Sequence, residues 1–193
     1  MAEKPSIHRD LLITYELLYN PCGFHYTQPQ IEEQNAEYGA SLFHVNAWLI
    51  RYRVAKVTPK KEGQFVTMWH RNEMGISQPY DESDTVDYYV ISTRKGDRFG
   101  QFVFPKAVLV NRKVLSVNGK DGKRAIRVYP AWDNPNSRQA KKTQAWQLDY
   151  FLEIPADRPI NQDRAAMLYR DTKQTFFNPL DVSGIIGKNP PQG

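Results

Sequence analysis

The sequence is short of the features that mark secreted and membrane proteins. Cys22 is the only cysteine among 193 residues, which excludes an intramolecular disulfide and favours a reducing environment. Acidic residues interrupt the first twenty positions, so we expect no secretory signal there. No apolar run approaches the roughly 20 residues that span a bilayer. We therefore expect a cytoplasmic protein that is not a membrane partner.

The sequence also lacks the complete motifs of the common catalytic sites. It contains no GxSxG, no HExxH and no phosphate-binding P-loop, and its four histidines show no i, i+4 pairing. Cys22 and His25 have CxxH spacing, but a zinc site needs about four ligands and no second pair lies nearby. We predict no catalytic residue, no metal site and no cofactor.

Positive charge is abundant, and it is concentrated in two segments. The net charge is +5 and the isoelectric point is about 9.2. Residues 51–71 hold six Lys or Arg against one Glu, and residues 94–147 hold thirteen against three acidic residues. Nucleic-acid-binding proteins concentrate cations where phosphates lie. A basic face for nucleic acid is one interpretation, and solubilising charge scattered over different sides of the fold is the other.

Periodicity predicts a single domain over residues 1–193 that mixes helices with hairpins. Helices are expected at 7–19, 107–115, 138–151 and 164–169. Strands are expected at 41–58, 63–71, 87–92, 99–104 and 123–129, with a polar loop at 72–85. A C-terminal extension is expected from about residue 155, with an apolar segment at 176–180 that packs against the fold and a flexible tail at 187–193.

Residues 51–71 read as two strands joined by a basic turn around Pro59, with cations at their ends. Alternation along the second strand puts Trp69 and Arg71 on one face, where they would stack a base and neutralise a phosphate. A Trp69 that is simply part of the core is the alternative. Lys60 and Lys61 are free at the turn to contact phosphates.

The predicted nucleic-acid contacts come from these two basic segments, and most of them would bind the phosphate backbone. They are Arg53, Lys56, Lys60, Lys61, Gln64, Trp69, Arg71, Lys106, Lys123, Arg124, Arg127, Arg138 and Lys141.

Four motifs in sequence order resemble those of one protein family. They are AKVTPKKEGQFVTMWHR at 55–71, GQFVFPK at 100–106, GKRAIRVYPAWD at 122–133 and TQAWQLDYF at 143–151. Over most of residues 5–153 the chain is similar to the MepB family, which is named from a gene neighbourhood with a multidrug efflux system. The resemblance implies an intracellular bacterial protein. It also implies an α/β (α+β) fold, with a mixed, largely antiparallel central sheet flanked by helices in a restriction-endonuclease-like core.

The resemblance to an endonuclease core raises a metal-dependent nuclease as an alternative. Such a site needs an acid on one strand, and an acid or Gln shortly before a Lys on the next, to bind Mg²⁺ and activate water. Val103 stands where that Lys should be, so the site would be degenerate. The available residues are Glu37, Asp84, Asp87, Gln101 and Lys106.

Asp87 also fits a simpler role, as a residue at the start of a strand that accepts backbone hydrogen bonds. A third interpretation is a small-molecule-binding accessory protein of an efflux system, with Trp69, Trp132 and Tyr129 around an apolar pocket. The main hypothesis is a nucleic-acid-binding protein that contacts phosphates and has little base readout. We lean against an enzyme.

Overall fold

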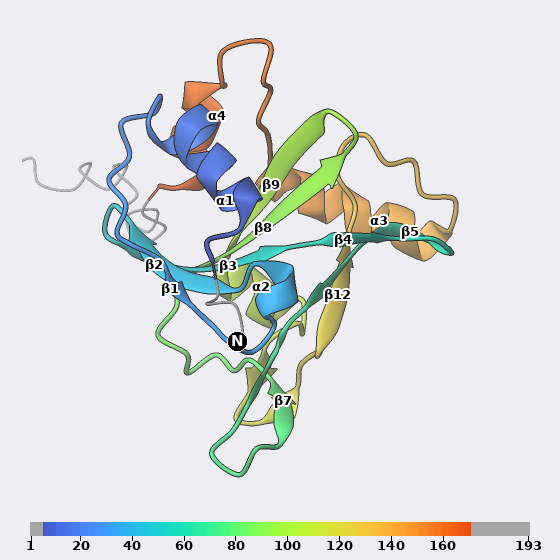
Figure 1. The fold of residues 1–193 in the computed structure, drawn as a ribbon. Coiled ribbons are helices and arrows are strands. Elements are labelled where there is room, and N and C mark those ends of the chain that lie inside the picture. Colours follow the sequence, from blue (N-terminus) through green and yellow to red (C-terminus); the bar gives the residue numbers. More distant parts are fainter. Residues whose placement is uncertain (1–5, 171–193) are drawn as a thin grey trace, which may run out of the picture.

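The central element of the computed structural model, which describes residues 6–170, is a six-stranded mixed sheet (Figure 1). Its strands β3 and β8 are parallel and the other neighbours are antiparallel. This largely antiparallel sheet, flanked by helices, confirms the predicted fold class. In spatial order the strands are β1 (Gln30–Ile31), β2 (Ser41–Val45), β3 (Trp48–Val54), β8 (Tyr88–Lys95), β9 (Arg98–Pro105) and β13 (Phe151–Glu153).

Two hydrophobic cores lie on the two faces of this sheet. Tyr88 and Val90 of β8 pack into one core, whereas Tyr89 and Ile91 pack into the other, because successive side chains of a strand point to opposite faces. The first face is covered by α1 (Arg9–Thr14), its π-helical continuation Tyr15–Tyr19 and α4 (Gln162–Leu168). Helix α4 therefore belongs to the first core.

The second face is covered by α2 (Lys106–Asn111), α3 (Arg138–Gln147) and a second, three-stranded sheet. That sheet has the order β12 (Ala125–Val128), β5 (Lys61–Thr67), β4 (Lys56–Thr58). Two small hairpins accompany it, β6 (Trp69–Arg71) with β7 (Ser77–Pro79), and β10 (Ser116–Val117) with β11 (Lys120–Asp121). Short 3-10 helices occupy Ala36–Tyr38 and Leu148–Tyr150.

Helices at the four predicted places and the strands at 87–92, 99–104 and 123–129 are confirmed, with shifted ends. The continuous strand predicted over 41–58 is wrong. Asn46 has a φ of 53° and forms a turn, so β2 and β3 make a hairpin. Asn tolerates this left-handed conformation because its short polar side chain bonds locally.

The basic hairpin predicted over 51–71 is smaller than expected, because β3 joins the central sheet and only β4 and β5 pair around Pro59. The predicted loop at 72–85 contains β7, which pairs with β6. The segments predicted at 176–180 and 187–193 lie outside the described residues. Among residues 6–170, no helix is long and apolar enough to cross a membrane.

Candidate nucleic-acid interface

A groove of about 590 Å³ lies between β12 and α3, and we call it the basic groove. Its four cations come from three segments, since Lys61 begins β5, Arg112 follows α2, and Lys123 and Arg127 belong to the stretch that enters and forms β12. No carboxylate of the described chain lines it. The fold thus gathers four positive charges around a single concavity.

The positive charge of the basic groove is not neutralised by neighbouring acids. Within residues 6–170, none of its four cations forms an ion pair. The Arg127 guanidinium donates to the carbonyl oxygens of Glu62 (3.2 Å) and Gly63 (3.1 Å) and to Thr58 Oγ1 (2.8 Å). These acceptors are neutral, so they fix the side chain but leave its charge available to an anion.

The other cations differ in how firmly they are held. The Arg112 guanidinium lies 4.8 Å from the centre of the Trp146 ring, in a cation–π contact. Lys61 and Lys123 are exposed, and as point charges on flexible stems they can adjust to a phosphate. The groove therefore combines two placed guanidinium groups with two adaptable ammonium groups.

A buried glutamine joins the two walls of the basic groove. Gln147 of α3 accepts a hydrogen bond from the Tyr129 amide (2.9 Å) and donates one to the Arg127 carbonyl (3.0 Å). Gly63 lets the start of β5 pack against Tyr129, because an added Cβ would lie only 2.6 Å from the Tyr129 ring. Its φ of +73° also favours glycine at this position. The groove is thus a built feature of the fold.

Helix α3 brings its first turn to the basic groove. Ser137 caps the helix by accepting a hydrogen bond from the Ala140 amide (3.1 Å), and both residues line the groove. The partial positive charge of a helix N-terminus favours anions at this position. Arg138 and Lys141 are exposed on the same helix and have no ion-pair partner in the described part of the chain.

The structure brings part of the predicted set to this groove. Lys61, Lys123 and Arg127 line it, and Arg138 and Lys141 extend from its helical wall. The remaining cations lie apart from its lining: Lys56, Lys60, Arg71, Lys106 and Arg124. Sequence reasoning missed Arg112, although it lies inside the strongly basic segment 94–147, because nothing in the sequence shows that the end of α2 approaches β12.

Two predicted contacts are corrected because they are buried. Arg53 is 2% exposed, since β3 enters the central sheet, and its guanidinium pairs with Glu32 Oε2 at 2.7 Å. Gln64 is 1% exposed and accepts a hydrogen bond from the Arg94 amide at 3.3 Å. Neither side chain can reach a ligand on this surface without rearrangement of the fold.

Trp69 is partly exposed on β6 and lies outside the basic groove. It is therefore neither a fully buried core residue nor part of the lining of the groove. The Arg71 guanidinium lies 5.4 Å from the centre of the Trp69 ring, so the two side chains are neighbours on one face of the strand, as predicted. Tyr129 lines the groove and Trp132 lines a neighbouring cavity of about 370 Å³. The three aromatic residues therefore do not surround one apolar pocket, which corrects the small-molecule interpretation.

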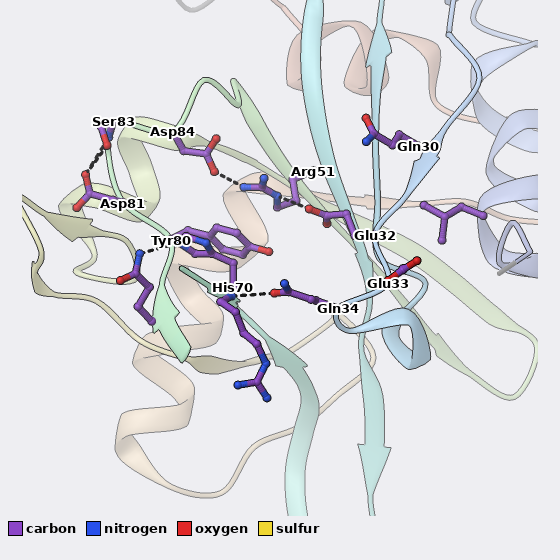
Figure 2. A pocket seen from close by; sticks show the side chains of 13 residues that line it. Gln30, Glu32, Glu33, Gln34, Arg51, His70, Tyr80, Asp81, Ser83 and Asp84 are labelled. Carbon is purple, nitrogen blue, oxygen red and sulfur yellow. Dashed lines mark hydrogen bonds and ion pairs between the residues drawn. The ribbon is translucent and has the colours of Figure 1, made fainter. Parts of the chain in front are cut away.

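A second polar cavity, of about 800 Å³, lies beside β1 and β7 and is rich in carboxylates. Figure 2 shows Arg51 between Asp84 and Glu32. Its guanidinium pairs with the Asp84 carboxylate and lies 3.5 Å from Glu32 Oε1. Burial lowers the pKa of Arg51, but Tyr80, Glu32 and Asp84 outweigh this and raise it above its ordinary value. The two carboxylates thus face a permanent cation.

A third carboxylate of this cavity, Asp81, is also engaged. It accepts hydrogen bonds from the backbone amides of Ser83 and Gly119 and from the hydroxyls of Ser83 and Ser116. These bonds favour the charged form and lower the pKa of Asp81 to about 2. Asp81 therefore serves to hold the loop after β7 against the β10–β11 hairpin.

Of the residues of the nuclease alternative, Asp84, Asp87 and Lys106 are neighbours, whereas Glu37 and Gln101 lie elsewhere. Asp87 Oδ2 accepts a hydrogen bond from the Leu49 amide at 2.9 Å, which matches its simpler predicted role. Lys106 Nζ donates to the Asp84 carbonyl at 2.6 Å, and Glu37 is exposed on a 3-10 helix. In the part of the chain that the structure describes, no three His, Cys, Asp or Glu residues are clustered so as to hold a metal ion.

Gln101, predicted as a metal-site residue of the nuclease alternative, lies in the interior with 0% exposure, which corrects that prediction. Its side-chain amide donates to Thr14 Oγ1 (2.7 Å) and Ser92 Oγ (3.1 Å), and its oxygen accepts from the Tyr169 hydroxyl (3.3 Å). This network joins α1, β8 and the end of α4. Gln101 therefore satisfies buried hydroxyl groups in the interior, a structural role away from any surface where a metal ion could bind.

These elements define the class as an α+β protein with a mixed sheet, an attached smaller sheet and an open basic groove. A family model described as MepB-like matches residues 32–153, and the chain belongs to this family. The crystal structure of MepB is similar, with a TM-score of 0.67 and 33% sequence identity, over 77% of this chain and 96% of that one.

A bacterial homing endonuclease gives a TM-score of 0.41 at 14% identity, over 72% of this chain and 86% of that one. A likeness of this size carries no argument about what the present chain does. No curated protein matches the chain.

Proposed function

We propose that the protein binds nucleic acid through the phosphate backbone and that the basic groove is its site. The observation that supports this most is the convergence of Lys61, Arg112, Lys123 and Arg127 on one groove without a lining carboxylate. Each of these cations attracts a phosphate of a nucleic acid. When the phosphates bind, the nucleic acid releases the counterions that had neutralised them, and this release favours binding. The first turn of α3 adds a further favourable potential at the same place.

Recognition at such a site would depend little on sequence. Phosphate contacts fix the position and orientation of a nucleic acid, whereas base edges carry the sequence information. Besides the Tyr129 and Trp146 rings, the long polar side chains that line the groove are cations or glutamines, and Gln147 is already committed to Arg127 and Tyr129. We therefore expect binding with similar affinity for different sequences of the same length.

The nuclease alternative is the weaker candidate. Of its candidate acids, Asp84 is paired with Arg51, and the same guanidinium lies 3.5 Å from Glu32 Oε1, so a positive charge already occupies the position that a divalent cation would need beside Asp84. A metal ion would have to displace this guanidinium, which the neighbouring acids hold in its charged form. The geometry thus favours binding without cleavage.

The salt dependence of binding tests the proposal. With the full chain and a labelled DNA duplex, fluorescence anisotropy gives the dissociation constant over a range of salt concentrations. Four neutralised phosphates predict a slope of log K against log[salt] of about −3 to −4, or about a 100-fold loss of affinity between roughly 50 and 200 mM salt. A slope near zero would exclude a phosphate-binding site.

A further inference from the structure

The tip of the β6–β7 hairpin exposes two large apolar side chains. Figure 1 shows this hairpin extending from the body of the molecule near the label β7. Met74 is 78% exposed and Ile76 is 55% exposed. Soluble surfaces carry single apolar residues without consequence, but two neighbouring ones at the end of a projection are less usual.

The tip has a defined conformation. Asn72 Oδ1 accepts hydrogen bonds from the backbone amides of Met74 (3.1 Å) and Ile76 (2.9 Å), and the Gly75 amide donates to the Asn72 carbonyl at 2.8 Å. The Arg71 guanidinium donates to the Gly75 carbonyl at 2.9 Å. The turn therefore holds Met74 and Ile76 outward, and binding would not have to order it first.

The hairpin is attached to the strand that forms one wall of the basic groove. The Arg124 guanidinium donates twice to the Ser77 carbonyl of β7, at 3.0 and 3.1 Å, and the Arg124 carbonyl accepts from the Met68 amide at 2.8 Å. Arg124 directly follows Lys123, which lines the groove. A path of positive charge thus leads from the groove along Arg124 to Arg71 at the hairpin.

We propose that Met74 and Ile76 insert as an apolar wedge between neighbouring base pairs of a duplex whose backbone lies in the basic groove. This inference depends on the proposed function. Proteins that bend DNA insert Met, Ile and similar side chains between base steps, and the apolar surface removed from water offsets part of the cost of unstacking. Glu73 is the acidic residue of the tip, and its exposed side chain would have to point away from the phosphates.

The charges beside the tip favour a nucleic acid as the occupant. Arg124 and Arg71 are bonded to the hairpin behind the tip, where they can meet the phosphates of a duplex whose bases contact Met74, although Arg71 also lines the carboxylate-rich cavity. A second copy of the chain would bring the same cations against each other, which opposes self-association through this tip.

The experiment uses the full chain and a duplex that contains 2-aminopurine, whose fluorescence rises when it is unstacked. We expect the wild type to raise the fluorescence. The double variant Met74→Ser with Ile76→Ser should lose this rise and bind about tenfold more weakly, with an unchanged salt slope. The control is Met167→Ser, because Met167 is 49% exposed on α4, on the other side of the central sheet, and this variant should behave as the wild type.

Other outcomes overturn the inference. A wild type that binds the duplex with the expected salt slope, but without a rise in fluorescence, contradicts the wedge and leaves the proposed function standing. A double variant that matches Met167→Ser in both measurements also contradicts it. If the double variant instead changes the molar mass measured by light scattering, the tip is a protein contact. A wild type that binds no duplex contradicts the proposed function and the wedge together.

Discussion

Replacement of both Lys61 and Lys123 by Glu is expected to weaken duplex binding by about 100-fold at low salt. Each change turns an attraction to a phosphate into a repulsion, and a loss of about tenfold per site corresponds to about 1.4 kcal/mol. The loss should be the same for every duplex sequence, because the proposed contacts of these side chains are to phosphates and not to base edges. Both residues are exposed and unpaired among the described residues, so the free energy of unfolding should change little.

A matched control separates the basic groove from the overall charge. Arg9→Glu with Arg158→Glu changes the net charge by the same amount, but these arginines lie at the start of α1 and after β13. The control should retain most of the affinity, with a small loss at low salt from long-range electrostatics. If the two double variants lose affinity equally, only net charge matters and the groove is not the site.

Arg53→Met is expected to lower the free energy of unfolding by about 3 kcal/mol. The substitution keeps much of the buried stem but removes the ion pair with Glu32 and the hydrogen bonds to the Tyr52 carbonyl and the Tyr80 hydroxyl. Removal of one member of a buried pair leaves its partners with unmet hydrogen bonds. For a domain of this size the melting temperature should fall by about 6–12 °C.

Arg158→Met provides the comparison for this stability measurement. Arg158 also pairs with carboxylates, Glu153 at 3.0 Å and Asp157 at 3.4 Å, but its side chain is exposed. Surface ion pairs contribute about 0 to 1 kcal/mol, so this variant should unfold within about 1 kcal/mol of the wild type. Urea unfolding followed by circular dichroism measures both. An Arg53→Met protein as stable as Arg158→Met would show that the buried pair contributes little.

The contrast between these two arginines shows what the sequence could not reveal. In the segment Arg51–Val54, charged and apolar residues alternate as they do in a half-exposed strand, so Arg53 read as a surface cation. Its partner Glu32 is 21 residues away and comes from the segment after β1, which no local pattern connects to β3. Burial of an arginine depends on such a tertiary partner, and only the fold supplies it.

The fold itself followed from local signals where these were strong. Ser137 is the cap expected before α3, Pro105 stands at the expected entry of α2, and short aromatic and β-branched runs bounded by turn residues indicated β8 and β9, because caps, proline and such runs act over a few residues. The division of the strands between two sheets could not be predicted from these local signals. It depends on the turn at Asn46 and on the change of sheet between β3 and β4, where the sequence pattern continues without interruption.

The sequence was sufficient to predict cations of the candidate site but not the groove that they line. Segregation of cations along the chain identified Lys61, Lys123 and Arg127, all three of which line the groove. Which of the thirteen predicted residues share one concavity depends on the register of β5 against β12 and on the packing of α3 over them. Arg112 reaches the groove only through that packing.

Hydrogen–deuterium exchange of the full chain, with and without a DNA duplex, tests most directly whether the basic groove is the binding site. We expect the duplex to slow exchange over residues 122–129 and 137–147, which form the walls of the groove. Exchange over α1 and α4, on the other face of the central sheet, should stay unchanged. Slower exchange confined to the cavity around Glu32 and Asp84, with none at the groove, would contradict the proposal.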